Sequence, residues 1–215
     1  DDVSSPQNNW ETEQSVDSVT IPKGWEIPSY QDDIEGAPEW AIRMREAYAR
    51  IIDLSEWWIE NRQIENGEIG GGWGDDVEFV PLWAMVGMIS SDAGEEVMSG
   101  SRKFMDGLWN SAAIDRQEGF TTVMTWVKPA SEPIGYSQPI MVAADYGNPR
   151  YVERCMISTK FLRDFATGVN AHGHRHFKSS HLSATRLGDK DWMKIDSTLC
   201  FRPAFSTSAL CWYNE

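Results

Sequence analysis

All four histidines of the chain lie within ten residues, at His172, His174, His176 and His181. Arg175 and Lys178 are interleaved with them. Alternate residues of a strand point to one face, so an extended segment would place the first three imidazoles together. Imidazole changes its charge near neutral pH and therefore suits proton transfer and the positioning of anions. We predict that this histidine segment carries out one of those two tasks.

Two other interpretations of the histidine segment stay open. The spacing H-x-H-x-H supplies nitrogen ligands for a divalent metal, with an oxygen from Asp75 or Asp76. The segment is equally compatible with a solvated surface loop that has no chemical role. We assign no cofactor to the protein, and a divalent metal at His172, His174 and His176 is the alternative to test.

A second unusual stretch, N-G-E-I-G-G-G-W-G-D-D-V-E, spans residues 66–78. Its density of glycines is incompatible with a regular helix or strand and suits a tight loop that passes close to another group. Trp73 offers an aromatic platform, and Asp75 and Asp76 come just before an apolar helix. The simpler interpretation is a helix–helix connection in which one of the two aspartates caps the next helix.

The same stretch offers carboxylates for a second type of chemistry. Two acids facing a glycosidic bond hydrolyse it, and their separation decides the stereochemical outcome. The candidate acids are Glu68, Asp75, Asp76 and Glu78. No G-x-S-x-G motif occurs, so a serine triad is unsupported.

The elements around these stretches are mostly helical. Apolar residues at helical spacing predict helices over 40–62, 76–90, 95–113, 136–146 and 150–169. The helix over 76–90 is apolar on every side, which predicts burial. Segment 121–127 suits a strand or a short helix, 128–133 a loop, and the residues after 169 short strands. An apolar helix ending in Asp-x-Gly occurs twice, with Gly94 and Gly147 53 residues apart, which favours stacked helical hairpins.

Composition narrows the classes of partner. Net charge is −14, which divides into −18 over residues 1–149 and +4 over residues 150–215. Nucleic acid is therefore not an expected partner, because phosphate binding needs a broad basic surface. No apolar run is long enough to predict a membrane span. Eleven tryptophans in an acidic chain are common where sugars are bound by stacking, although large cores also use tryptophan. Three cysteines leave at least one thiol outside any internal disulfide.

The chain divides into two regions. Residues 1–36 are polar and proline-containing, and we predict an extended arm with no core of its own. Residues 37–215 form the predicted helical domain. The chain begins Asp1-Asp2 without methionine or leader, and we interpret it as a mature, processed or excised piece.

The glycine-rich stretch and G-H-R-H-F-K-S, set among helical hairpins, resemble the (α/α)-toroid polysaccharide lyases that act on uronic-acid polymers such as glucuronan or alginate. The resemblance covers roughly residues 38–190. It implies a mainly α fold of antiparallel hairpins, part of a larger toroid, with short strands near the C-terminus. It also implies an enzyme that cleaves an acidic polysaccharide by β-elimination, secreted or periplasmic.

By this resemblance His174 or His176 transfers the proton and Arg175 faces the carboxylate of the substrate. The catalytic tyrosine of the family has four candidates: Tyr136, Tyr146, Tyr151 and Tyr213. We expect the glycine loop and the histidine segment to meet at one site and to share substrate binding through Asn66, Glu68, Trp73, Asp75, Asp76, Asn170, His172 and Lys178. An (α/α) glycoside hydrolase using Asp76 or Glu78 and a non-catalytic sugar-binding module are the alternatives.

Overall fold

The structure is a computed structural model that describes residues 35–90, 94–188 and 201–215. The described chain is mainly helical, as predicted, with short two-residue and three-residue strands. The predicted arm lies almost wholly outside these residues. No helix within the described ranges is long and apolar enough to cross a membrane.

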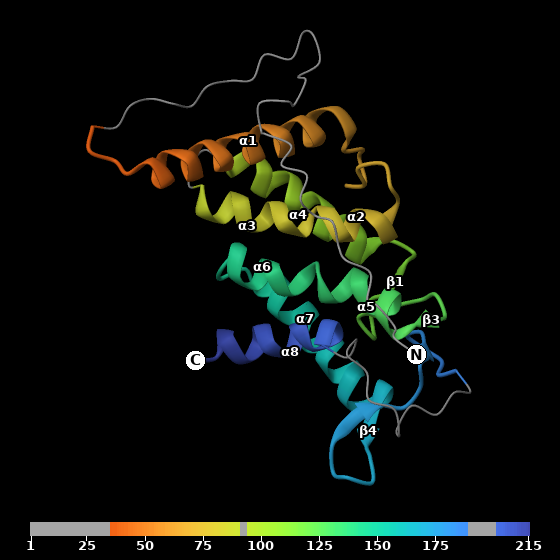
Figure 1. Ribbon diagram of the computed structural model, residues 1–215. Coiled ribbons are helices and arrows are strands. Elements are labelled where there is room, and N and C mark those ends of the chain that lie inside the picture. The colour runs from red at the N-terminus through yellow and green to blue at the C-terminus, as the bar shows by residue number, and fades with distance from the viewer. Residues whose placement is uncertain (1–34, 91–93, 189–200) are drawn as a thin grey trace, which may run out of the picture.

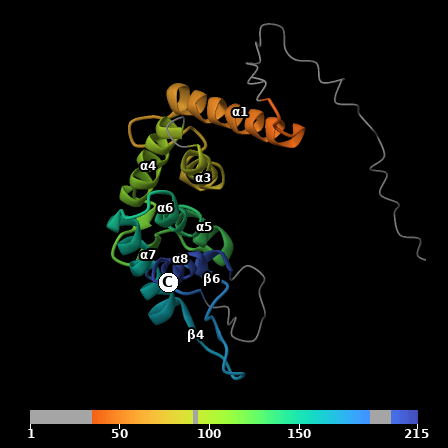
Figure 2. The same ribbon diagram turned by 90° about the vertical axis from the view of Figure 1, so that its left-hand side faces the viewer.

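The helices form antiparallel hairpins in two layers (Figures 1 and 2). One layer contains α3 (Pro81–Ile89), α6 (Gln138–Ala144) and α8 (Phe201–Tyr213), which pack side by side in that order. Behind it lie α4 (Glu95–Asn110) and α7 (Pro149–Phe161), each joined to the front layer by a short connection. The long helix α1 (Glu39–Arg62) packs on α3 and α4 at one edge of the stack.

This arrangement gathers the long connections at one end of the stack. The segment between α1 and α3, the segment between α4 and α6, and residues 162–188 after α7 lie on the right of Figure 1. They carry α2 (Trp73–Phe79), α5 (Val127–Gly135) and the strand pairs. The chemistry-bearing stretches of the sequence belong to these connections, so the hairpins form a scaffold that holds them.

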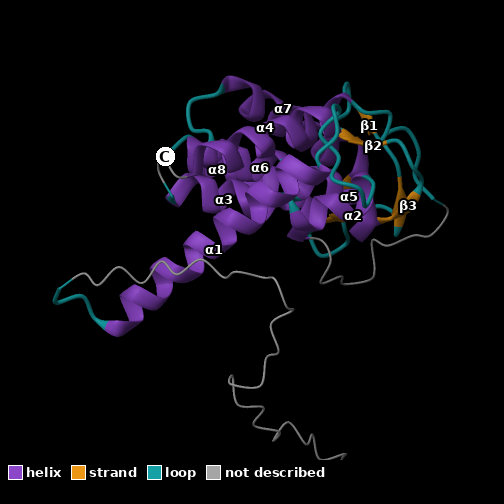
Figure 3. Cartoon of the chain, turned by 90° about the horizontal axis from the view of Figure 1, so that it is seen from above, coloured by secondary structure: helices purple, strands orange, loops and turns teal. Residues whose placement is uncertain are grey.

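Three small antiparallel ladders complete the end of the stack. Strand β1 (Ile114–Asp115) pairs with β2 (Phe120–Thr121), and β3 (Thr125–Trp126) pairs with β6 (His181–Leu182). Strand β4 (Thr167–Val169) pairs with β5 (Arg175–Phe177), with Gly168 opposite His176. Figure 3 shows β1, β2 and β3 beside α5 and away from the C-terminal end of α8.

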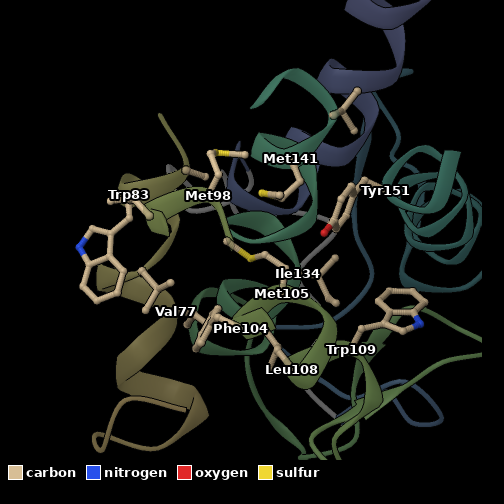
Figure 4. Packing of buried hydrophobic residues seen from close by; sticks show 14 of the residues in the cluster. Val77, Trp83, Met98, Phe104, Met105, Leu108, Trp109, Ile134, Met141 and Tyr151 are labelled. Atoms are coloured by element: carbon tan, nitrogen blue, oxygen red, sulfur yellow. The ribbon is translucent and has the colours of Figure 1, made fainter. Parts of the chain in front are cut away.

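The main core lies between the two layers (Figure 4). Phe104, Met105 and Leu108 of α4 meet Met141 of α6 and Tyr151 of α7, all fully buried. Burying side chains of this size contributes roughly 1.5–3 kcal/mol each. A second, smaller cluster lies under the strands, where Phe120 and Phe161 stack with ring centroids 4.6 Å apart.

Several element boundaries differ from the prediction, and proline explains the first of them. The predicted helix over 76–90 is two helices, because Pro81 begins α3 at its first position. The predicted loop at 128–133 is helix α5, and the predicted helix over 95–113 ends at Asn110. The predicted helix over 150–169 ends at Phe161, after which come a π-helical turn (Leu162–Ala166) and β4.

Helix α3 also corrects the burial prediction. The side chains of Leu82, Met85, Met88 and Ile89 are 44–59% exposed, whereas Trp83 and Ala84 face the core. Only one face of this apolar helix is therefore covered by the described chain.

Candidate functional site

The three residues predicted to be catalytic line one cavity. It has a volume of about 610 Å³ and lies between the β4–β5 hairpin, the end of α7 and the start of α8. His174, Arg175 and His176 contribute to its wall together with Arg163, and we call it the basic cavity. The remaining wall is neutral, with lining residues Thr159, Leu162, Thr167, Phe177, Pro203, Ala204 and Thr207.

The turn of the β4–β5 hairpin is organised by Asn170. Its side-chain oxygen accepts hydrogen bonds from the backbone N–H groups of His172 and His174, both at 3.0 Å. Gly173 takes a φ of +81°, which glycine adopts without the Cβ penalty of other residues. Asn170 was predicted to bind substrate, but its oxygen is used to build the turn that presents His174.

The guanidinium of Arg175 is fixed at the rim of the basic cavity. Its Nη1 donates to the backbone oxygen of Arg163 and to the hydroxyl of Thr167, both at 2.9 Å. The side chain is exposed. Guanidinium carries five N–H donors in a planar fork that matches a carboxylate. A cation held in place in this way suits the recognition of an anionic group.

The two histidines of the cavity differ in exposure and in the hydrogen bonds they make. His174 is exposed at the turn, whereas His176 is half-buried in β5. The Nδ1 of His176 lies 3.2 Å from the backbone oxygen of Phe177. A carbonyl only accepts, so Nδ1 carries the hydrogen of the neutral ring. The Nε2 of His176 is buried. His174 is therefore the better placed of the two for proton transfer to a bound molecule.

The other predicted residues of the histidine segment lie outside the cavity wall. Lys178 is half-buried, and its ammonium donates to the backbone oxygen of Phe165 at 2.8 Å. His181 belongs to β6, where its ring lies 4.8 Å from that of Trp126. His172 is exposed in the turn. The short strands predicted after residue 169 are present, but β5 begins only at Arg175, so strand alternation does not place His172, His174 and His176 on one face.

The described residues contain no group of three or more His, Cys, Asp or Glu side chains that could hold a metal ion. The turn at Asn170 separates His172 from β5, so the proposed set of His172, His174 and His176 is not assembled there.

The glycine loop is held together by Asp76. This buried carboxylate accepts hydrogen bonds from the backbone N–H groups of Ile69 (2.9 Å) and Gly71 (3.0 Å). Both of its oxygens therefore have a structural role in holding the loop, which the sequence did not predict. It does not cap α2 either, since Gly72 occupies the N-cap without a side-chain bond. Asp75, by contrast, is exposed.

Next to this loop is a more polar hollow of about 680 Å³, which we call the loop hollow. Asn66 and Trp73 line it with Lys103 and Asp106 of α4. Trp73 is half-buried rather than open, and its ring lies 5.4 Å from that of Phe104. The Asn66 amide donates to the Glu68 carboxylate at 2.8 Å, so these two predicted ligands pair with each other.

The glycine loop and the histidine segment are not neighbours. Figures 1 and 2 show them at opposite ends of the row of connections, and the two hollows share no lining residue. The prediction of a single joint site is wrong. The connection that carries α5 lies between them, since α5 contacts both α2 and β6.

The structure has a third hollow that the sequence does not predict, which we call the central cleft. It has a volume of about 630 Å³ and lies where α3, α6 and α8 begin. Glu78, Tyr136 and Arg202 line it, and its other walls are mostly apolar. Arg202 pairs with Glu132, lies 4.0 Å from Glu78, and stacks 4.7 Å from the ring centre of Tyr136. No local motif predicts this cluster, because Glu78, Tyr136 and Arg202 lie far apart in the sequence.

Three of the four candidate tyrosines lie away from the cavities. Tyr151 is fully buried in the core, and burial raises the pKa of its hydroxyl to about 12, with Asp106 adding to the shift. Tyr146 and Tyr213 pack together near the C-terminal end of α8. Only Tyr136 lines one of the three hollows described above, the central cleft.

Comparisons of the chain with protein-family models, with curated proteins and with solved structures give no significant match.

Proposed function

We propose that this protein cleaves a uronic-acid polymer by β-elimination and that the reaction takes place in the basic cavity. The observation that carries the proposal is the convergence of His174, Arg175 and His176 on one cavity wall beside Arg163. Removing a proton next to a carboxylate builds negative charge, which fixed cations offset. In a chain with a net charge of −14, this concentration of cationic and basic groups suits an acidic sugar.

The proposed roles follow from exposure and hydrogen bonding. Arg175 faces the carboxylate of the substrate. His174 takes the proton next to that carboxylate, and the resulting imidazolium returns a proton to the oxygen that leaves from the neighbouring carbon. The glycosidic C–O bond breaks as a C=C bond forms, so protons and electrons balance within the sugar and one histidine. No tyrosine is among the residues that line the basic cavity.

We also propose that the hairpins form a segment of an (α/α) toroid. Parallel front helices α3, α6 and α8 with antiparallel helices behind them support this proposal, as does the gathering of long connections at one end. Because polymers of uronic acids are extracellular materials, we place the protein outside the cytoplasm, secreted or periplasmic.

A glycoside hydrolase is the second candidate, and the central cleft favours it. Of the two acids predicted for that reaction, Asp76 is committed to the glycine loop, whereas Glu78 lines the cleft. The apolar wall of the cleft offers a surface for the face of a sugar ring.

One assay separates these functions. The protein is incubated with glucuronan, with alginate and with a neutral glycan, while ultraviolet absorbance and reducing ends are recorded together. Absorbance from an unsaturated sugar supports the lyase. New reducing ends without that absorbance identify a hydrolase, and binding with neither product identifies a sugar-binding module. Either of the last two results overturns the proposal.

A further inference from the structure

Helix α1 has two apolar faces, and the described chain covers only one of them. Ile52 and Ser55 are buried against the body, and Ile59 lies against Gly100 of α4. Figure 3 shows the N-terminal half of α1 extending beyond the other helices. The second face therefore has no partner along much of its length within the described residues.

The second face has the spacing of a coiled-coil seam. Its residues follow one another at intervals of four, three, four, three and four, which repeats every seven residues, and they are Trp40, Met44, Ala47, Ile51, Leu54 and Trp58. Trp40 is 71% exposed, Leu54 51%, Met44 47% and Ile51 40%, whereas Trp58 is half-buried against Phe79. At 1.5 Å per residue the seam is about 27 Å long.

We propose that this seam binds the same helix of a second copy of the chain, in antiparallel orientation. A heptad seam fits a partner helix with the same repeat, because each side chain then enters a hole of the facing helix. Among the described helices, α3 also exposes apolar side chains, but only over about two turns, whereas the seam of α1 covers about five. A second α1 has the same heptad repeat, and it is therefore the partner we infer.

The charge distribution also favours contact through α1. Two copies of a chain with a net charge of −14 repel each other over most of their surfaces. Residues 39–62 contain five acidic and four basic side chains, a net of −1, so the remaining residues carry −13. Two of the four basic side chains form ion pairs within the helix: Arg43 pairs with Glu39, and Arg50 pairs with Glu46. Self-association through α1 therefore brings together surfaces of low net charge.

Antiparallel packing matches the sizes of the seam residues. Centred near position 49, it places Met44 against the partner's Leu54, and Ala47 against the partner's Ile51. A parallel pair would place Ala47 against its own copy and leave a gap in the middle of the seam. The antiparallel pair also sets the helix dipoles in opposite directions, which is the favourable arrangement.

The test is the oligomeric state of the full chain and of two variants, measured by sedimentation velocity over a range of concentrations. We expect a dimer for the wild type. Ile51→Glu places a carboxylate in the seam and should weaken dimerisation about 100-fold or more. Met156→Glu changes a methionine that is 57% exposed on α7 and should leave the dimer intact. A monomeric wild type, a dimeric Ile51→Glu variant or a monomeric Met156→Glu variant overturns the proposal. Circular dichroism checks that each variant is folded.

Cysteine cross-linking tests the orientation. A mixture of Met44→Cys and Leu54→Cys chains should form a disulfide-linked dimer, whereas Met44→Cys alone should give no more than the parent protein with its native thiols. Efficient cross-linking of Met44→Cys to itself would overturn the antiparallel arrangement.

Discussion

Asp76 shows that residue type alone does not decide the role of a side chain. The sequence places it among the candidate substrate-binding residues. In the structure its two oxygens accept hydrogen bonds from the backbone N–H groups of Ile69 and Gly71. Both interpretations agree with an acid in a glycine-rich loop. What decides between them is burial, which depends on how the loop folds back over α2.

This role of Asp76 predicts a loss of stability. Asp76→Asn keeps the size of the side chain but presents an amide N–H₂ to a backbone N–H, which leaves a buried donor unsatisfied. We expect the free energy of unfolding to fall by about 1–3 kcal/mol in urea denaturation. Asp75→Asn, at the exposed neighbour, should change it by less than about 0.5 kcal/mol. Equal unfolding midpoints for the two variants would refute the role.

Cys155 and Cys211 are both free thiols with opposite environments, buried and exposed. Burial raises the pKa of the Cys155 thiol to about 12. The folded protein therefore keeps this proton where an unfolded chain, with its ordinary pKa of about 8.5, loses it. The contribution to stability is complete below pH ~8.5 and is lost as the pH rises toward 12.

At pH 10 this thiol should lower the free energy of unfolding by about 2 kcal/mol relative to its contribution below pH ~8.5. Urea denaturation at the two pH values measures the difference. Cys155→Ala should remove most of it, and Cys211→Ala should not. If Cys155→Ala keeps the full pH dependence, burial of this thiol is not its cause.

Arg175 should contribute to affinity more than to stability, because its guanidinium is exposed at the cavity rim. We expect Arg175→Ala to weaken binding of an acidic oligosaccharide at least about tenfold, the scale of a charged hydrogen bond. Binding of a neutral oligosaccharide should change little. Arg116→Ala removes an equal charge outside the basic cavity and serves as the control in the same calorimetric titration. An equal loss in both variants would mean that only net charge matters.

At the scale of elements, the sequence predicts helices well where apolar residues recur at helical spacing. Helices α1 and α4 show this pattern and were found within a few residues of their ends. Helix α5 was missed because it contains Pro129 and Pro133 within nine residues. The sequence does not predict helix α8. This helix packs against α5, α6 and α7 together, so its apolar residues show no clear helical period.

The contact between the glycine loop and α4 gives a prediction at this scale. A Cβ on Gly107 of α4 would lie 1.7 Å from the backbone oxygen of Asn66, so neither element could keep its position. Gly107→Ala should destabilise the protein by at least about 2 kcal/mol despite alanine's better helix propensity. Gly74→Ala, in α2 with open space around it, should be neutral or slightly stabilising. Thermal unfolding of both variants checks this, and equal midpoints would contradict the contact.

At the scale of the molecule, the sequence predicts stacked hairpins with functional connections at one end. It does not predict which connections meet. The basic cavity is built wholly from residues after 150, which is the part of the chain with a net charge of +4. The predicted joint site does not form, because α5 lies between the glycine loop and the histidine segment. The sequence predicts a loop, not this helix, over residues 128–133.

The proposed lyase reaction takes place in the basic cavity and depends on His174. The most direct measurement compares wild type, His174→Ala and His181→Ala for the formation of unsaturated product from glucuronan and alginate. Both histidines belong to one cluster in the sequence, but only His174 lines the cavity. We predict that His174→Ala lowers turnover by about 10² or more, the scale of a lost proton-transfer group, and that His181→Ala keeps at least about half of the wild-type rate. Equal activity of wild type and a folded His174→Ala variant would contradict the account.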